Sequence, residues 1–126
     1  MGILEFAKPV LVVCVCDRAA AVEFYRDKLG LRMTGEDPFA SVFDVGGNAL
    51  RVSTVEGFVP HEHTVMGFKV PDVAAAVSAL RDAGVAFTIH PGFNQDALGV
   101  WTAPDGGIQV AWFKDPDGNV LSVTNA

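Results

Sequence analysis

The closing stretch of the chain, residues 113–124, predicts a strand, a tight turn and a second strand. The turn is Asp115-Pro116-Asp117-Gly118, in which proline presets φ and glycine accepts the positive φ that ends the turn. The residues on both sides are rich in β-branched and aromatic side chains, which favour strands. A β-hairpin therefore closes the sequence.

An earlier stretch, residues 44–52, repeats this pattern. With Asp44 aligned on Asp115, Asn48 falls on Asn119 and Arg51 falls on Ser122. The repeat indicates that the chain is a duplicated unit, and it relates positions in one half to positions in the other.

The hydrophobic pattern in each half predicts the order βαβββ. The first half has predicted strands at residues 9–16, 31–34, 39–44 and 48–55, and a helix at 18–29 on which Val22, Tyr25 and Leu29 form one apolar stripe. The second half has predicted strands at 65–70, 85–89 and 120–124, with two more strands or a split pair at 100–103 and 108–113, and a helix at 73–83. We expect a single domain over residues 1–126, made of module one (9–56), a linker (57–64) and module two (65–126). Residues 90–105 are an insertion in module two, and such loops often carry specificity.

Composition excludes several classes of partner. Nine basic and 15 acidic residues give a net charge of −6, which argues against a nucleic-acid partner. No apolar run approaches the roughly 20 residues needed to span a bilayer, and no leader pattern is present, so we expect no membrane partner and a cytoplasmic location. Cys14 and Cys16 stand two positions apart on a strand, a poor geometry for a disulfide, and are expected to remain thiols.

Two motifs resemble one known family. Residues 24–31 (FYRDKLGL) look like the first-helix signature of the vicinal oxygen chelate superfamily, and residues 113–119 (FKDPDGN) look like its closing hairpin. That superfamily includes glyoxalase I, extradiol dioxygenases, fosfomycin-resistance enzymes and bleomycin-resistance binding proteins. The resemblance covers residues 10–124. It implies an α+β fold of two tandem βαβββ modules, with a shared curved-sheet cleft, helices outside and a homodimeric state.

The resemblance also implies four positions for the ligands of a divalent metal. By spacing, they fall on Val10, Arg51, Val65 and Ser122. Valine offers no lone pair, arginine is a permanent cation and a serine hydroxyl alone is a poor anchor for a metal. We therefore expect no metal cofactor.

Strand alternation suggests which side chains line the cleft. If Val10 faces inward, Cys14 does too, and Arg51 shares its strand face with Ala49 and Ser53. In the closing hairpin, Ser122 is expected to face inward, with Phe113, Ala111 and Gln109 across the hairpin on the same inward face, and Trp112 is expected on the helix side. The predicted ligand-binding residues are Arg51, Ser122, Gln109, Trp101, Phe113, Cys14 and Phe93.

Several of these residues have a second interpretation. Arg51 either holds a carboxylate, phosphate or enolate, or is solvated or paired with Asp44 or Glu56. Trp101 lies in the pocket or the core, and Phe93 is a lid or an anchor of its own loop. Cys14 is a soft-metal ligand or a plain core residue.

The three histidines are candidate metal ligands or catalytic bases. His61 and His63, one residue apart in the linker, are a solvated segment or a metal-binding pair. His90 lacks an evident partner as a general base.

The leading hypothesis is a metal-independent small-molecule binding protein, similar to the bleomycin-resistance group, whose ligand is partly aromatic with an anionic or polar group near Arg51. The alternatives are a glyoxalase- or dioxygenase-like metalloenzyme (a lyase or oxygenase), a metal-free isomerase that uses Arg51, or a structural or regulatory dimer with a vestigial cleft.

Overall fold

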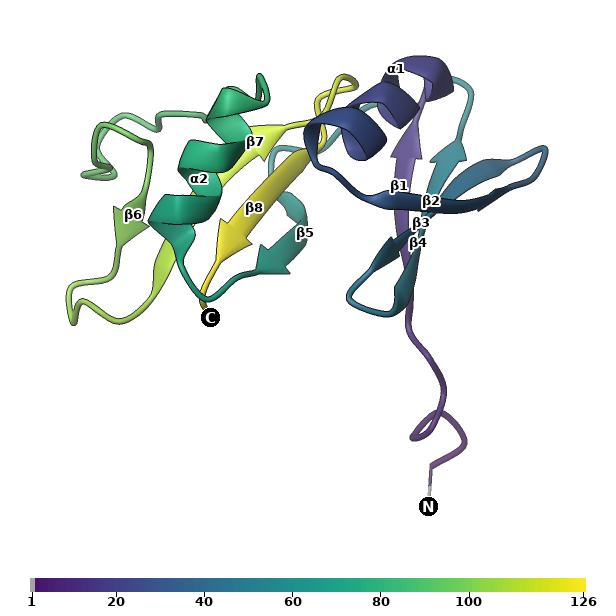
Figure 1. Ribbon diagram of the computed structural model, residues 1–126, viewed down its shortest axis with the longest axis horizontal. Helices are drawn as coiled ribbons and strands as arrows, with labels where there is room; N and C mark the ends of the chain where they lie inside the picture. The colour runs from purple at the N-terminus through teal and green to yellow at the C-terminus, as the bar shows by residue number, and fades with distance from the viewer. Residues whose placement is uncertain (1) are drawn as a thin grey trace. The chain divides into compact units, whose positions relative to one another are not determined.

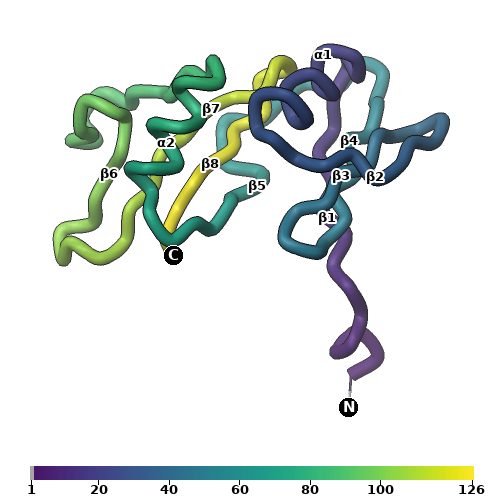
Figure 2. Tube along the Cα trace, viewed as in Figure 1, coloured from purple at the N-terminus to yellow at the C-terminus, as the bar shows by residue number. Residues whose placement is uncertain are grey.

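The computed structural model describes residues 2–126. The chain separates into two compact units, Met1–Phe58 and Val59–Ala126. Each unit contains one four-stranded mixed sheet and helical structure, so the fold is α+β (Figures 1 and 2). The boundary between the units lies inside the segment predicted as a linker.

The first unit has the predicted order βαβββ. Its elements are β1 (Val10–Val15), α1 (Arg18–Val22), the π-helical segment η1 (Glu23–Lys28), β2 (Arg32–Glu36), β3 (Ala40–Val45) and β4 (Asn48–Thr54). The sheet order is β1-β4-β3-β2, in which β1 runs parallel to β4 and the other pairs are antiparallel. The predicted strands agree with these bounds within two residues at each end.

The helix of the first unit changes its winding half-way. Leu29 donates its N–H to the carbonyl of Phe24 at 3.0 Å, an i to i+5 bond that marks a π-helical turn. The buried side chains of this helix are Ala21, Phe24 and Tyr25. The predicted apolar stripe is confirmed only at Tyr25, because a π turn adds a residue to the repeat and shifts the buried face.

One face of the first sheet packs under this helix. The ring centroids of Tyr25 and Phe43 lie 6.0 Å apart, and Leu50 and Val52 are fully buried. The residues that alternate with Leu50 and Val52 point to the other side, which we call the first helix-free face. Arg51 lies on this face.

The second unit repeats the order with a shorter second strand. Its elements are β5 (Thr64–Lys69), α2 (Val73–Asp82), β6 (Trp101–Thr102), β7 (Gln109–Lys114) and β8 (Val120–Thr124). The sheet order is β5-β8-β7-β6, with β5 parallel to β8 (Figure 1). The helix α2 packs on β7 and β8, and Phe113 and Leu121 are fully buried on that side.

The predicted strand at residues 85–89 is wrong in extent. Only Phe87 forms an isolated bridge, opposite Phe113, and Thr88 donates its N–H to the carbonyl of Trp112 at 2.8 Å. The carbonyl of Thr88 accepts instead from the side chain of Gln95. A side chain of the insertion loop therefore forms the hydrogen bond that a neighbouring strand would form in a continuous sheet.

The predicted facing of β7 is also wrong. Phe113 pairs with Leu121 and Ala111 with Val123, whereas Trp112 pairs with Ser122. Cross-strand partners share a face, so Phe113, Ala111 and Gln109 lie on the helix side, and Trp112 lies on the opposite one, the second helix-free face. A register shift of one residue exchanges every side chain between faces.

The turn of the closing hairpin sets this register. The carboxylate of Asp115 accepts the N–H groups of Asp117 and Asn119 at 3.0 and 2.8 Å, and its other oxygen accepts from the Asn119 amide at 2.8 Å. The residues between the paired Lys114 and Val120 thus form a closed loop. The turn role expected of Asp115 is confirmed, and Asp115 and Asn119 are both buried, at 4% and 1% exposed.

No helix among residues 2–126 is long and apolar enough to cross a membrane.

Candidate functional site

Arg51 lies at the centre of the first helix-free face. Its cross-strand neighbours are Val12 on β1 and Val42 on β3. The same register places Val10 beside Ala49 and Cys14 beside Ser53, so the predicted grouping of these side chains on one face is confirmed. Cys14 and Cys16 form no disulfide.

The guanidinium of Arg51 is paired within its own unit. Its Nη2 donates to Oδ2 of Asp37 at 2.8 Å, and the two side chains are 34% and 37% exposed. The other carboxylate oxygen of Asp37 accepts the N–H groups of Phe39 and Ala40 at 2.8 and 2.9 Å. The Arg51 hydrogen bond, followed by that of Phe39, holds the pKa of Asp37 below its usual range. The partner of Arg51 is thus Asp37, rather than the expected Asp44 or Glu56.

Ser122 occupies the matching place on the second helix-free face. Its neighbours there are Gly67 on β5 and Trp112 on β7. A β-carbon added to Gly67 would lie 3.1 Å from Oγ of Ser122, so the two residues face the same side at close range. Trp112, Ser122 and Gly67 are therefore cross-strand neighbours on one face, with one large side chain beside two small residues.

An aromatic cluster surrounds Trp112. Its ring centroid lies 5.3 Å from that of His90 and 5.9 Å from that of Phe93, and the His90 and Phe93 centroids are 5.3 Å apart. We call these three side chains the aromatic cluster. His90 and Phe93 belong to the insertion, so the insertion loop packs on the second helix-free face.

A single glutamine fixes the loop that carries this cluster. The side-chain oxygen of Gln95 accepts the N–H of His90 at 2.6 Å, and its amide nitrogen donates to the carbonyls of Thr88 and Gly99 at 2.9 and 2.8 Å. The residue before it, Asn94, has a positive φ of 55°. Because three backbone groups of the loop bind one side chain, the positions of His90 and Phe93 are set by the loop itself.

A cavity of about 540 Å³ adjoins the aromatic cluster. His90 belongs to both, and Thr88, Lys114 and Val120 also line it. Lys114 and Val120 are paired across the β7–β8 hairpin, two residues from Trp112 and Ser122, and so share their face. The rest of the lining is Pro60, His61, Glu62 and Gly118.

The start of the second unit forms the opposite wall of this cavity. A β-carbon at Gly118 would lie 3.1 Å from Cγ of Pro60, so the segment before β5 runs close to the hairpin turn. The imidazoles of His61 and His63 stack with centroids 5.1 Å apart. His61 and Glu62 therefore reach the same cavity as His90, a convergence that the sequence did not indicate.

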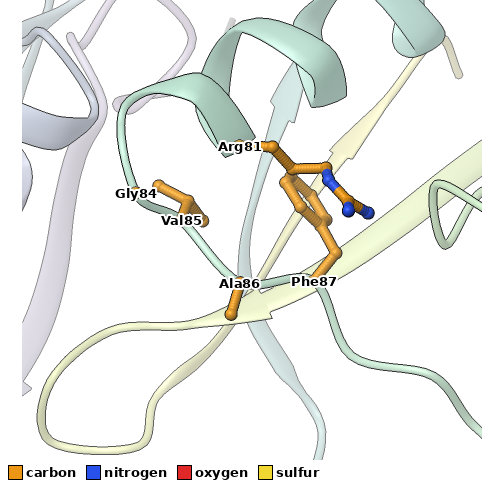
Figure 3. A pocket seen from close by; sticks show the side chains of 5 residues that line it. All are labelled: Arg81, Gly84, Val85, Ala86 and Phe87. Atoms are coloured by element: carbon orange, nitrogen blue, oxygen red, sulfur yellow. The ribbon is translucent and has the colours of Figure 1, made fainter.

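A second, smaller pocket is lined by one arginine and otherwise by glycine and apolar residues. It has a volume of about 360 Å³ at the C-terminal end of α2 and is lined by Arg81, Gly84, Val85, Ala86 and Phe87 (Figure 3). Arg81 stands in the last turn of α2, where a cation stabilises the helix dipole. This lining brings no imidazole or carboxylate together, so the larger cavity is the better candidate site.

Family comparisons agree with the architecture. The chain matches the model of the Glyoxalase/Bleomycin resistance protein/Dioxygenase superfamily over residues 8–123. The chain belongs to this superfamily. No individual curated protein matches the sequence.

Solved structures of this superfamily share the fold at low sequence identity. A glyoxalase/bleomycin resistance protein/dioxygenase from Alicyclobacillus acidocaldarius is 17% identical, with a TM-score of 0.71 over 94% of this chain and 90% of that one. A lactoylglutathione lyase from Agrobacterium tumefaciens is 20% identical, with a TM-score of 0.71 over 95% and 93%. A superfamily member from Sphaerobacter thermophilus is 23% identical, with a TM-score of 0.73 over 97% and 98%. At these identities the likeness shows the fold alone.

The residues at the superfamily's implied metal positions do not fit a divalent metal. Arg51 and Ser122 lie on the helix-free faces, and the residues directly beside them on the parallel strands are Val12 and Gly67. The predicted ligand positions on these strands, Val10 and Val65, also offer no lone pair to a metal. Within residues 2–126, no three His, Cys, Asp or Glu side chains come together in an arrangement that holds a metal ion.

The remaining predicted ligand-binding residues fall into different surroundings. Phe113 is fully buried in the core and packs edge-on against Phe87. Gln109 donates its side-chain amide to the Thr102 hydroxyl at 3.3 Å. Trp101 pairs with Val110 and therefore shares the face of Trp112, and Phe93 is 48% exposed in the aromatic cluster.

Most residues of the candidate site were absent from the predicted ligand-binding set, including all those that line the cavity. Trp112 was assigned to the wrong face because the hairpin register was misjudged by one residue. Lys114 gave no signal, since a lysine next to a turn is usually solvated. Gln95 sits among polar loop residues, and nothing in its local sequence indicates that it binds three backbone groups of its own loop.

Proposed function

We propose that the protein binds a small, partly aromatic molecule on the second helix-free face, without a divalent metal. The observation that carries the proposal is the cavity of about 540 Å³ that adjoins the aromatic cluster through His90. Small-molecule sites typically measure about 300–1,000 Å³ and combine apolar or aromatic walls with a few polar groups. This cavity has both.

The aromatic cluster supplies the apolar contact. Phe93 is half exposed, so part of its ring is available to a ligand. Aromatic pairs contribute about 0.5–1.5 kcal/mol beyond the area they bury. Of the cluster, His90 lines the cavity, so a planar ligand seated there contacts the His90 ring with little rearrangement, because Gln95 holds the loop in place.

The donor chemistry supports binding without a metal. Valine and glycine have no side-chain lone pair, and the arginine at the third implied position is a cation. The charge of Arg51 is balanced by Asp37. Binding of an anion by Arg51, as the sequence suggested, would therefore compete with this ion pair. The homodimeric state and the cytoplasmic location stay predictions.

Calorimetric titration with indole, a neutral planar probe, tests the proposal. We expect indole to bind equally well before and after treatment of the protein with EDTA. Phe93→Leu removes the ring that packs against His90 and is expected to weaken binding about threefold to tenfold. The matched control is Phe39→Leu, an exposed phenylalanine of the first unit, which is expected to leave binding unchanged.

Two results would overturn the proposal. Failure of indole and other planar probes to bind would remove its ligand-binding part. Stoichiometric zinc, nickel, manganese or iron in protein purified without chelator would remove its metal-free part and favour the alternative metalloenzyme.

A further inference from the structure

The candidate cavity is lined by two opposite charges. Lys114 is the last residue of β7, and Glu62 lies in the segment that leads into β5. Neither side chain forms an ion pair with any residue in the range 2–126. The ammonium of Lys114 and the carboxylate of Glu62 are therefore farther apart than the 4.0 Å of an ion pair, although both residues line the same cavity.

Separated opposite charges on one cavity favour a ligand that carries both signs. A single anion would meet the attraction of Lys114 and the repulsion of Glu62, and a single cation would meet the reverse. A zwitterion placed between them gains from both, since each of its charges faces the opposite one. The remaining polar lining, His61 and His90, offers ring nitrogens that donate or accept hydrogen bonds.

The aromatic cluster defines the rest of the ligand. His90 lines the cavity and also contacts Trp112 and Phe93, both with centroids 5.3 Å away. A planar group bound next to the charged end would lie against the His90 ring, the member of the cluster that lines the cavity. The cavity thus combines a place for two charges with a place for one aromatic ring.

We propose that this cavity binds an aromatic amino acid or a close zwitterionic relative. Its carboxylate faces Lys114, its ammonium faces Glu62 and its ring packs beside His90 toward Phe93. This inference rests on the proposed function and names the ligand class of the same site.

Four probes that share one ring system separate the contributions. Indole carries no charge, indole propionate carries only the anion, tryptamine carries only the cation, and tryptophan carries both. In calorimetric titrations of the whole chain, we expect tryptophan to bind at least about tenfold more tightly than indole. The two singly charged probes are expected to bind no more tightly than tryptophan.

Two single substitutions test the orientation of the zwitterion. Lys114→Met is expected to weaken tryptophan and indole propionate about threefold to tenfold and to leave tryptamine no weaker. Glu62→Gln is expected to weaken tryptophan and tryptamine and to leave indole propionate no weaker. Both side chains are exposed, so the variants are expected to fold, and unchanged circular dichroism and indole affinity confirm it.

The outcomes distinguish the two proposals. If indole binds but tryptophan binds no more tightly, the zwitterion site is wrong and the aromatic site stands. If both substitutions weaken all four probes equally, the charges do not contact the ligand and the inference is overturned. If indole itself fails to bind, the proposed function falls as well.

Discussion

The two hairpins that align in the sequence are built differently. In the first unit, Val45 pairs with Asn48, and the turn between them consists of Gly46 and Gly47 with φ of 57° and 88°. In the second unit, the longer turn is organised by the buried carboxylate of Asp115. The first turn depends on backbone freedom and the second on a side-chain acceptor.

The helix-free faces differ in the same way. Arg51 lies between two valines and is paired with Asp37, so its charge is satisfied within the first unit. Ser122 lies between Gly67 and Trp112, and the adjoining insertion loop brings His90 and Phe93 onto that face. A common backbone frame thus supports a closed ion pair in one unit and an aromatic wall beside a cavity in the other. The repeated backbone places Arg51 and Ser122 at equivalent positions, but the two side chains and their neighbours differ in chemistry.

The largest effect is expected from Asp115→Ala. Removal of this buried carboxylate leaves the N–H groups of Asp117 and Asn119 and the Asn119 amide without their acceptor. We expect the free energy of unfolding to fall by roughly 2–4 kcal/mol, measured by urea denaturation. At the aligned position, Asp44→Ala removes only an exposed contact to Arg32 at 3.9 Å and is expected to cost less than about 1 kcal/mol. Equal losses in the two variants would show that both hairpins depend on their aspartates.

An intermediate effect is expected from Gly47→Ala. At φ of 88°, an added β-carbon strains the backbone, and we expect a loss of about 1–2 kcal/mol in the same assay. The control is Gly35→Ala on β2, where φ is not positive and a β-carbon meets open space. A Gly47 variant as stable as this control would contradict the backbone account of the first turn.

The smallest effect is expected from Asp37→Asn, because the Arg51 pair is about one-third exposed and screened by solvent. The pKa of Asp37 is held below its ordinary 3.8, so its ionised form stabilises the folded state. This contribution of the Asp37 carboxylate to stability is fully present above about pH 3.8 and is lost as the pH falls through the lowered pKa. Thermal midpoints measured from neutral pH to below pH 3 should therefore fall less steeply in the variant.

The matched control for this pH profile is Glu56→Gln, since Glu56 was the other candidate partner of Arg51. It is expected to follow the wild type. The assignment of the ion pair would be contradicted if the thermal midpoint of the Glu56 variant fell less steeply at acid pH than that of the wild type. It would also be contradicted if the Asp37 variant fell as steeply as the wild type.

Most of the fold follows from local patterns. The turn residues, the hydrophobic pattern and the repeat of Asp44–Asn48 at Asp115–Asn119 predicted the βαβββ order of both units. These signals depend on neighbours in the sequence. Asp17 and Asp72, for example, cap their helices by accepting the N–H groups of Ala20 and Ala75.

The candidate site was harder to predict from the sequence than the fold. The face of Trp112 depends on how many residues the Asp115 turn encloses, and an error of one residue placed Phe113 in the cleft and Trp112 in the core. The partner of Arg51 lies 14 residues away, on the loop that follows β2, where local charge pairing pointed to Asp44 or Glu56.

The sequence by itself determined the duplicated fold and the absence of metal donors at its implied ligand positions, because turn chemistry, hydrophobic period and donor type are properties of individual residues. Tertiary structure decided which residues share a face and which segments share a cavity. His61, Glu62, His90 and Lys114 come from three separate segments of the chain, and only the folded sheet and the Gln95-bound loop bring them together. Register and loop closure are long-range properties, so the site they create had no signature in the local sequence.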